Sequence, residues 1–446
     1  MIGFETIGNA TLTLYDGEPL LTTDPWVYGN PYFGSWGHKY KIPKEQLNNI
    51  KKTKFVWLSH GHPDHIDSDS FSLFEGKTIL LADHFNKRIF NDLSKKYDCI
   101  ELKSNQWFSI SKNIRIKSFS DWNQDSCLIV EILKKDIILN LNDGEALGWS
   151  KEIKKIIKNY KNKFLLRLIS WGDADMINFY NHNNHFILPL AAQKKPCGET
   201  YSYNLKKWGC NYILPFSSMH RYVREDSIKM NKFTTPLKLH YEKFNNKYGE
   251  MLPAFIKWNS LNGNYESINP DENIDEVKSP SYYGDLWSDE LEKNDEIILK
   301  NYFLKFEHLK NKFGFINFNV GGKEFNIKLS NRKEGIKFEV PRNSLICSIQ
   351  NNIFDDLLIG NFMKTTLINV PSLYPNFTPY VAKYGDNGEA YSNEELKKYF
   401  DYYKFNSANF WIDFLKIKSE SYIRSKLGKY QSIYYLARSI RRMASF

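Results

Sequence analysis

The sequence has few cysteines and no long apolar segment. Its five cysteines are scattered over 446 residues, and no two of them form a Cys-x-x-Cys pair. This argues against a disulfide framework and favours a reducing compartment. A run of about 18 apolar residues, which a membrane-spanning helix needs, is absent. Residues 1–6 show no charged leader before an apolar stretch, so we expect no signal peptide and predict a cytoplasmic location.

Basic residues outnumber acidic ones without forming a stripe. The chain has 61 Lys and Arg against 51 Asp and Glu, a formal net charge of +10. An anionic small-molecule substrate is therefore expected, whereas nucleic-acid binding is not indicated. The exception is residues 424–442, where arginines alternate with apolar residues. An amphipathic basic helix there would pack on its own protein or, alternatively, touch a membrane surface.

The most informative segment is residues 58–67, Leu-Ser-His-Gly-His-Pro-Asp-His-Ile-Asp. It follows the apolar run 55–58, which predicts a strand that ends in a tight polar loop. Protonated imidazoles crowded this closely would repel one another, whereas neutral imidazole and carboxylate are natural ligands of a divalent metal. The alternative is a polar surface loop. The candidate ligands in this segment are His60, His62, Asp64 and His65.

The pattern His-x-His-x-Asp-His resembles the signature of the metallo-β-lactamase superfamily. The resemblance implies a four-layer αβ/βα sandwich and two divalent metal ions, either iron or zinc or manganese. It assigns His60 and His62 to one metal, and Asp64 and His65 to the other. Each imidazole should then be oriented by an acceptor at its other ring nitrogen. We expect Asp64 to be catalytic as well as a ligand.

Such a site needs further ligands later in the chain. Asp143 directly follows the predicted strand 136–141 and is expected to bridge the metals and act in catalysis; the alternative is a turn aspartate before Gly144. Asp121 stands where the superfamily usually has a histidine, with Asp125 as second choice. The last ligand is a histidine, for which we favour His220; the alternatives are His182, His185 and His240.

Two further predictions concern the substrate and the helices. The loop 24–36 is rich in glycine, proline and aromatic residues, so it predicts either packing or a substrate pocket. The substrate-contact candidates there and just beyond are Trp26, Trp36 and His38. His84 is interpreted as a helix-start residue within a predicted helix 83–96.

Hydrophobic residues make up 42% of the chain, enough for two domains or one large domain with an extension. We predict a catalytic α/β domain over 1–260, a polar linker or arm over 261–290, and a smaller α+β region over 291–446 that ends in the basic helical tail. In that region we expect helices 289–312 and 344–361, a hairpin 314–320 and 324–329, and a strand 335–340.

Several segments together resemble one family, the CMP-N-acetylneuraminate hydroxylases. They are Asp24-Pro25-Trp26, the histidine turn, residues 125–131 and 138–143, Pro215-Phe216 and residues 355–362. Animal members of that family carry a Rieske iron–sulfur domain, whose paired Cys and His ligands are absent here. The resemblance therefore implies that a separate electron-transfer protein supplies the electrons.

Three functions follow from these observations. The first is an O₂-dependent hydroxylase of an anionic sugar or sugar nucleotide, as the family resemblance implies. The second is a hydrolase of a lactone, amide or phosphodiester that uses a metal-bound hydroxide. The third is a binding protein whose metal site has decayed, which the missing third histidine suggests and the intact first cluster opposes.

Overall fold

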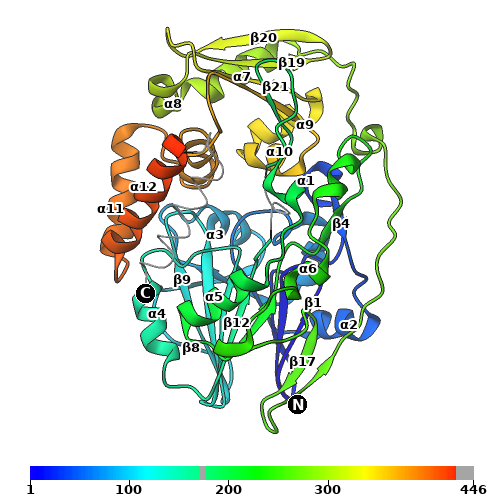
Figure 1. The fold of residues 1–446 in the computed structure, drawn as a ribbon, viewed down its shortest axis with the longest axis vertical. Helices are drawn as coiled ribbons and strands as arrows, with labels where there is room; N and C mark the ends of the chain where they lie inside the picture. The colour runs from blue at the N-terminus through cyan, green and yellow to red at the C-terminus, as the bar shows by residue number, and fades with distance from the viewer. Residues whose placement is uncertain (171–175, 428–446) are drawn as a thin grey trace.

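Two large sheets form the body of the molecule (Figure 1). The computed structural model describes residues 1–170 and 176–427. In spatial order the first sheet consists of β18 (Asn264–Ser267), β17 (Ile256–Asn259), β1 (Ile2–Ile7), β2 (Thr11–Asp16), β3 (Glu18–Thr23), β5 (Phe55–Leu58), β6 (Thr78–Ala82) and β7 (Asp98–Leu102). The second consists of β16 (Glu250–Met251), β14 (Tyr212–Pro215), β12 (Asn162–Arg167), β11 (Asp136–Asn142), β10 (Ser126–Ile132), β9 (Ile114–Ser120) and β8 (Phe108–Ser109).

The two sheets pack face to face because each presents an apolar face to the other. Phe4, Leu14 and Trp57 of the first sheet share a fully buried core with Leu128 and Phe164 of the second. Burying each such side chain contributes about 1.5–3 kcal/mol relative to leaving it exposed. The sheets therefore form the two inner layers of a sandwich.

Helices cover the outer face of each sheet. On the first sheet, α2 (Lys44–Lys52) and α3 (Arg88–Leu93) place Ile50 and Leu93 in a common apolar cluster with β5 and β6. On the second, α4 (Ser150–Ile157) and α5 (Gly198–Trp208) bury Ile153 and Leu205 in the same way. This arrangement confirms the predicted four-layer αβ/βα sandwich.

A third sheet lies beyond the sandwich, at the top of Figure 1. Its order is β13 (Phe179–Asn181), β22 (Lys364–Ile368), β21 (Gly335–Glu339), β19 (Phe315–Val320) and β20 (Lys323–Lys328). It packs with the helices α7 (Lys293–Leu304), α8 (Glu307–Lys312), α9 (Arg342–Gln350) and α10 (Phe354–Gly360). We call this sheet and these four helices the third-sheet region. The domain boundaries at 260 and 290 stay a prediction. One strand of this sheet, β13, lies in the part of the chain before residue 260.

Several predicted helices are shorter or divided. The predicted helix 289–312 is two helices, α7 and α8, and 344–361 is likewise α9 and α10. The break before α10 contains Asn352, whose φ of 51° is left-handed. The prediction of a helix over 83–96 was wrong outside α3. Lys87, with a left-handed φ of 58°, prevents the helix from beginning earlier.

Two helices near the end of the described chain pack over the second sheet's loops. They are α11 (Asn393–Phe405) and α12 (Phe410–Leu427), and α11 begins with a capping box formed by Ser392 and Glu395. The smaller elements are α1 (Pro31–Gly34), α6 (Leu237–Tyr241), β4 (Trp36–His38) and β15 (His220–Tyr222). Among the described residues no helix is long and apolar enough to cross a membrane. The basic tail predicted over 424–442 falls mostly outside the described residues.

Candidate metal centre

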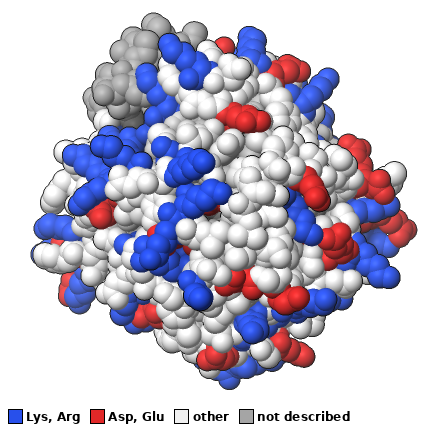
Figure 2. All heavy atoms as spheres, turned by 90° about the horizontal axis from the view of Figure 1, so that it is seen from below, with Lys and Arg blue, Asp and Glu red and all other residues white. Residues whose placement is uncertain are grey.

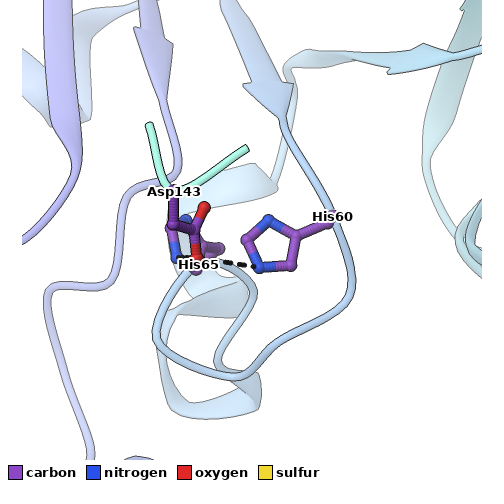
Figure 3. A group of neighbouring side chains, drawn as sticks. All are labelled: His60, His65 and Asp143. Atoms are coloured by element: carbon purple, nitrogen blue, oxygen red, sulfur yellow. Dashed lines mark ion pairs between the residues drawn. The ribbon is translucent and has the colours of Figure 1, made fainter. Parts of the chain in front are cut away.

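Strand ends bring the candidate ligands together. The turn that carries the histidines follows β5, and Asp143 follows β11 of the other sheet. The turn is held by its own backbone, since the amide of His65 donates to the carbonyl of His62 at 3.0 Å. Figure 3 shows the Asp143 carboxylate beside the imidazoles of His60 and His65. Each sheet therefore contributes side chains from a strand end to the same site.

His60, His65 and Asp143 form the group that could hold a metal ion, with one ligand atom of each lying within 4.8 Å of the others. Asp143 Oδ2 is 3.6 Å from His60 Nε2 and 3.8 Å from His65 Nε2. Asp64 Oδ2 lies 3.2 Å from the same nitrogen of His65. His62 belongs to this cluster as well, because its Nδ1 is 2.8 Å from His60 Nε2. Each of the four predicted ligands in the turn therefore lies beside Asp143 or beside another of the four.

The other ring nitrogen of each imidazole is engaged by a neighbour. His60 Nδ1 is 2.9 Å from Ser59 Oγ, and His62 Nε2 donates to Asp355 Oδ2 at 3.0 Å. His65 Nδ1 faces Asp24 Oδ2 at 3.4 Å. Hydrogen bonding at one nitrogen fixes the ring and leaves the second nitrogen for a metal. This pattern is the orientation that the superfamily resemblance implied.

Asp64 is anchored on both oxygens. Asn9 Nδ2 donates to its Oδ2 at 2.9 Å, and the Tyr32 hydroxyl donates to its Oδ1 at 2.5 Å. Tyr32 lies in α1, where its φ of 56° is unusual for a bulky residue. Such a conformation costs about 1–3 kcal/mol and persists only where surrounding contacts impose it. Packing of α1 thus places a phenol on a candidate ligand.

The electrostatics of the cluster favour ionised carboxylates. Burial raises the pKa of Asp143, but the charges of His60 and His65 outweigh it and hold that pKa below its usual value. For His62 burial acts in the opposite direction and lowers the pKa, yet the hydrogen bond and charge of Asp355 raise it to about 9. In such pairs the positive charge of a protonated imidazole balances the carboxylates, as the charge of a metal ion would.

The residues fit a metal ion by a further criterion. His65 Nε2 is buried and has no hydrogen-bond partner among the described residues, although carboxylates of Asp64 and Asp143 surround it. A buried imidazole nitrogen that faces two carboxylate oxygens without a well-formed hydrogen bond is a natural place for a cation. Histidine and carboxylate donors suit iron, zinc or manganese, so the chemistry of the donor set agrees with the geometry.

The structure does not bring Asp121 into this group. Its carboxylate accepts the backbone N–H groups of Asn123 at 2.8 Å and Leu147 at 3.2 Å, so it caps the loop after β9. Burial raises its pKa to about 8. Asp125, the second choice for this ligand, lies 3.9 Å from Lys383 Nζ. The assignment of Asp121 as a ligand stays a prediction, and its bonds to the backbone account for it without a metal.

His220 lies close enough to Asp64 for the charge of that carboxylate to act on the pKa of its ring. Its ring stacks on Trp36 at 3.4 Å, and both of its nitrogens are buried without a hydrogen-bond partner among the described residues. Burial lowers its pKa to about 3, so the ring is neutral, as a ligand must be. Of the alternatives, His240 pairs with Tyr201 at 2.8 Å, and His185 is exposed.

The predicted substrate contacts lie inside the protein. Trp26 and Trp36 are fully buried, and His38 stacks on Trp26 at 4.0 Å. Burial lowers the pKa of His38 to about 4. These side chains therefore perform the packing role that the sequence left open, and their contact with substrate stays a prediction. His84 is also buried, and it pairs with Tyr403 at 3.0 Å, outside any helix.

Sequence reasoning missed five residues that shape the cluster, namely Asn9, Asp24, Tyr32, Asn142 and Asp355. Asp24 gave a usable signal, since it follows β3 directly, as Asp143 follows β11. It accepts the backbone N–H of Ser59 at 2.8 Å and the amide of Asn142 at 3.0 Å. Asn142 and Asp355 stand in segments that carry the family resemblance, and Tyr32 stands in the aromatic loop 24–36, but only the fold brings them and Asn9 to the turn.

The sandwich and the oriented histidine–carboxylate turn together confirm the resemblance to the metallo-β-lactamase superfamily. No family model matches the chain. Among curated proteins it is similar to cytidine monophosphate-N-acetylneuraminic acid hydroxylase of Asterias rubens, with 24% identity over 146 residues, 30% of this chain and 22% of that protein. The enzyme of Danio rerio is 24% identical over 147 residues, 31% of this chain and 25% of that protein.

Among solved structures, the isothiocyanate hydrolase from Delia radicum gut bacteria is 15% identical with a TM-score of 0.36, covering 60% of this chain and 99% of that one. CmlA, a diiron β-hydroxylase from Streptomyces venezuelae, is 14% identical with a TM-score of 0.28, covering 39% of this chain and 35% of that one. The matched curated segments span a quarter or less of those two relatives. The fold and the group of histidine and carboxylate donors together support a metal-dependent enzyme.

Proposed function

We propose that this protein is a metal-dependent hydroxylase that uses O₂ to oxidise a C–H bond of an anionic sugar or sugar nucleotide. The observation that supports it most is the group His60, His65 and Asp143, with each imidazole oriented through its second nitrogen. The similar curated proteins are cytidine monophosphate-N-acetylneuraminic acid hydroxylases, and the proposed substrate class is taken from them.

Bound iron would supply the activation of O₂ in this reaction. One oxygen atom enters the C–H bond and the other leaves as water, which requires two electrons and two protons from outside. We propose a separate electron-transfer protein as the source of the electrons. The chain's own residues hold the ions and place proton-carrying groups, above all the Tyr32 hydroxyl on Asp64 Oδ1.

Positive charge near the site would attract the substrate. Lys383 Nζ lies 3.9 Å from Asp125 Oδ2, and the charges of nearby carboxylates, Asp143 among them, outweigh burial and raise the pKa of its ammonium group. On the face shown in Figure 2, Lys and Arg side chains are spread among acidic and neutral ones. We expect general attraction of a small anion, as the net charge of +10 implies, and no binding of nucleic acid.

A second candidate is a hydrolase of a lactone, amide or phosphodiester. Bound zinc or manganese would supply a hydroxide at neutral pH. The observation that favours it is the placement of Asp64, whose Oδ2 lies 3.2 Å from His65 Nε2 and is held by Asn9, so that it could accept a proton.

Metal analysis and turnover separate the two functions. Protein purified without chelator is analysed for iron, zinc and manganese, then incubated with CMP-N-acetylneuraminic acid, a chemical reductant and O₂. A hydroxylase should contain iron and add one oxygen atom to the substrate, detectable by mass spectrometry. Zinc with turnover of an ester or phosphodiester in anaerobic buffer would favour the hydrolase. Protein that takes up no stoichiometric ion from an excess of any of the three would refute both functions.

A further inference from the structure

One contact to the histidine turn comes from outside the sandwich. Asp355, near the start of α10 in the third-sheet region, accepts a hydrogen bond from His62 Nε2 at 3.0 Å across 293 residues of sequence. The Asp355 side chain is 8% exposed and that of His62 24%. A largely buried carboxylate is therefore placed against a candidate ligand by a different part of the molecule.

The contact determines which nitrogen of His62 is free. Despite burial, Asp355 raises the pKa of His62 to about 9, but a metal binds only the neutral ring, which carries a single proton, and the carboxylate acceptor at Nε2 holds that proton there. The lone pair then lies on Nδ1, which is the atom that faces His60 Nε2 at 2.8 Å. In the structure these two nitrogens are hydrogen-bonded to each other, and a metal held by both would take the place of the proton between them.

Asp355 lies on the wrong side of His62 to bind the same ion. Its Oδ2 contacts Nε2, whereas Nδ1 is the nitrogen directed at His60. The ring therefore separates the carboxylate from the space between the two histidines. This geometry distinguishes a residue that orients a ligand from a residue that is one.

The position of α10 is fixed at both ends. At its start, the backbone N–H of Phe354 donates to Asp386 Oδ2 at 3.2 Å. At its end, the carbonyl of Gly360 accepts the Ser35 hydroxyl at 2.5 Å. Ser35 caps α1, the helix that carries Tyr32 to Asp64. The helix α10 therefore contacts His62 directly through Asp355 and contacts α1, which carries Tyr32, through Gly360.

We propose that Asp355 is a positioning residue of the metal centre, so that the third-sheet region completes a site whose ligands all come from the sandwich. Asp355 holds His62 as the Nε2-protonated tautomer and presents Nδ1 to the metal. The inference rests on the metal centre of the proposed function. Removal of such an orienting carboxylate typically weakens metal binding about 10- to 100-fold.

The test compares metal affinity in full-length variants. Metal-free wild type, Asp355→Ala and Asp355→Asn are titrated with Zn²⁺ against a chelator indicator, and the dissociation constants are compared. We expect Asp355→Ala to weaken binding about 10- to 100-fold. Asp355→Asn should lose less, because its amide oxygen still accepts the hydrogen bond from Nε2. The ¹⁵N spectrum of the zinc-loaded protein should show His62 bound through Nδ1 in wild type and a mixture in Asp355→Ala.

A matched control is Asp295→Asn in α7, a buried carboxylate of the same region that pairs with Arg342 at 2.6 Å. It should lower the thermal midpoint without changing zinc affinity. Equal affinity of wild type and Asp355→Ala would overturn the inference while leaving the proposed function standing. Absence of zinc, iron and manganese binding in wild type would overturn both. If Asp355→Ala fails to fold, the Asn variant and its ¹⁵N spectrum decide the question.

Discussion

The sandwich and the third-sheet region differ in what they give to the candidate centre. The sandwich carries every residue of the group that could hold a metal, and its strand ends place them. The third-sheet region has a core dominated by phenylalanine and adds no residue to that group. It adds Asp355 and the helix that packs on α1. The comparison teaches that the ligands can come from one region while another sets their geometry.

The strongest way to break the comparison is to remove a ligand from the sandwich. Asp143→Ala deletes the carboxylate between His60 and His65, so we expect loss of at least one bound metal per chain and of detectable turnover. Metal content by mass spectrometry checks the first effect. Glu145→Gln is the matched control, since Glu145 pairs with Lys207 and Arg167 and not with a histidine. Full metal occupancy in Asp143→Ala would show that Asp143 is not a ligand.

The next test weakens the core of the other region. Phe338 is fully buried and its ring packs against Phe318, Phe354 and Phe377. Phe338→Ala should lower the free energy of unfolding by about 3–5 kcal/mol, measured by denaturant titration. It should also weaken zinc binding, because α10 begins at Phe354. The control Leu205→Ala, in the outer layer of the sandwich, should destabilise without that loss, and equal zinc affinity in both variants would contradict the dependence.

A smaller effect is expected from the phenol on Asp64. Tyr32→Phe removes the hydroxyl that donates at 2.5 Å and keeps the buried ring. The loss of one hydrogen bond to a charged group costs about 1.5–3 kcal/mol. Asp64 keeps its charge and its bond from Asn9, so we expect most of this loss in the stability of the fold and at most about 1.4 kcal/mol, or about tenfold, in metal binding. Calorimetric titration with Zn²⁺ measures it, and an unchanged affinity would remove Tyr32 from the centre.

The smallest effect concerns the pH dependence of the third-sheet region. Burial raises the pKa of Asp386, which accepts the Tyr302 hydroxyl at 2.6 Å, to about 7. In the unfolded chain this carboxyl titrates at about pH 4, so the folded state retains a proton that the unfolded state releases. Stability is therefore full below about pH 4 and falls until about pH 7. Relative to Asp386→Asn, the thermal midpoint of wild type should decline over that range, and a constant difference would contradict the assignment.

Local patterns predicted much of the sandwich. The strand 78–82 matches β6, and the predicted strand before Asp143 matches β11 except for its last residue. The hairpin around Gly321 and Gly322 was also predicted, because two left-handed glycines mark a tight turn. The helices were less accurate, since residues 83–87 form a loop that buries His84 against α11. That loop depends on Tyr403, which lies 319 residues away.

The candidate centre divides in the same way. The spacing of the histidine turn identified His60, His62, Asp64 and His65, and the end of a strand identified Asp143. Nothing local indicated that Trp26 and Trp36 would be buried, since an aromatic loop can pack or bind with the same composition. Nor could the sequence separate Asp121 from Asp125, because both follow the same strand and only tertiary contacts show what their carboxylates meet.

The position of the metal-type chemistry could be predicted from local spacing alone, because six consecutive positions after one strand hold three imidazoles and a carboxylate. Only the tertiary structure decided which nitrogen of each imidazole is free. That choice depends on Ser59 beside His60, Asp24 beside His65 and Asp355 beside His62. Residue spacing is a local property of the chain, whereas the contacts from Asp24 and from Asp355, which lies 293 residues from His62, are fixed by packing.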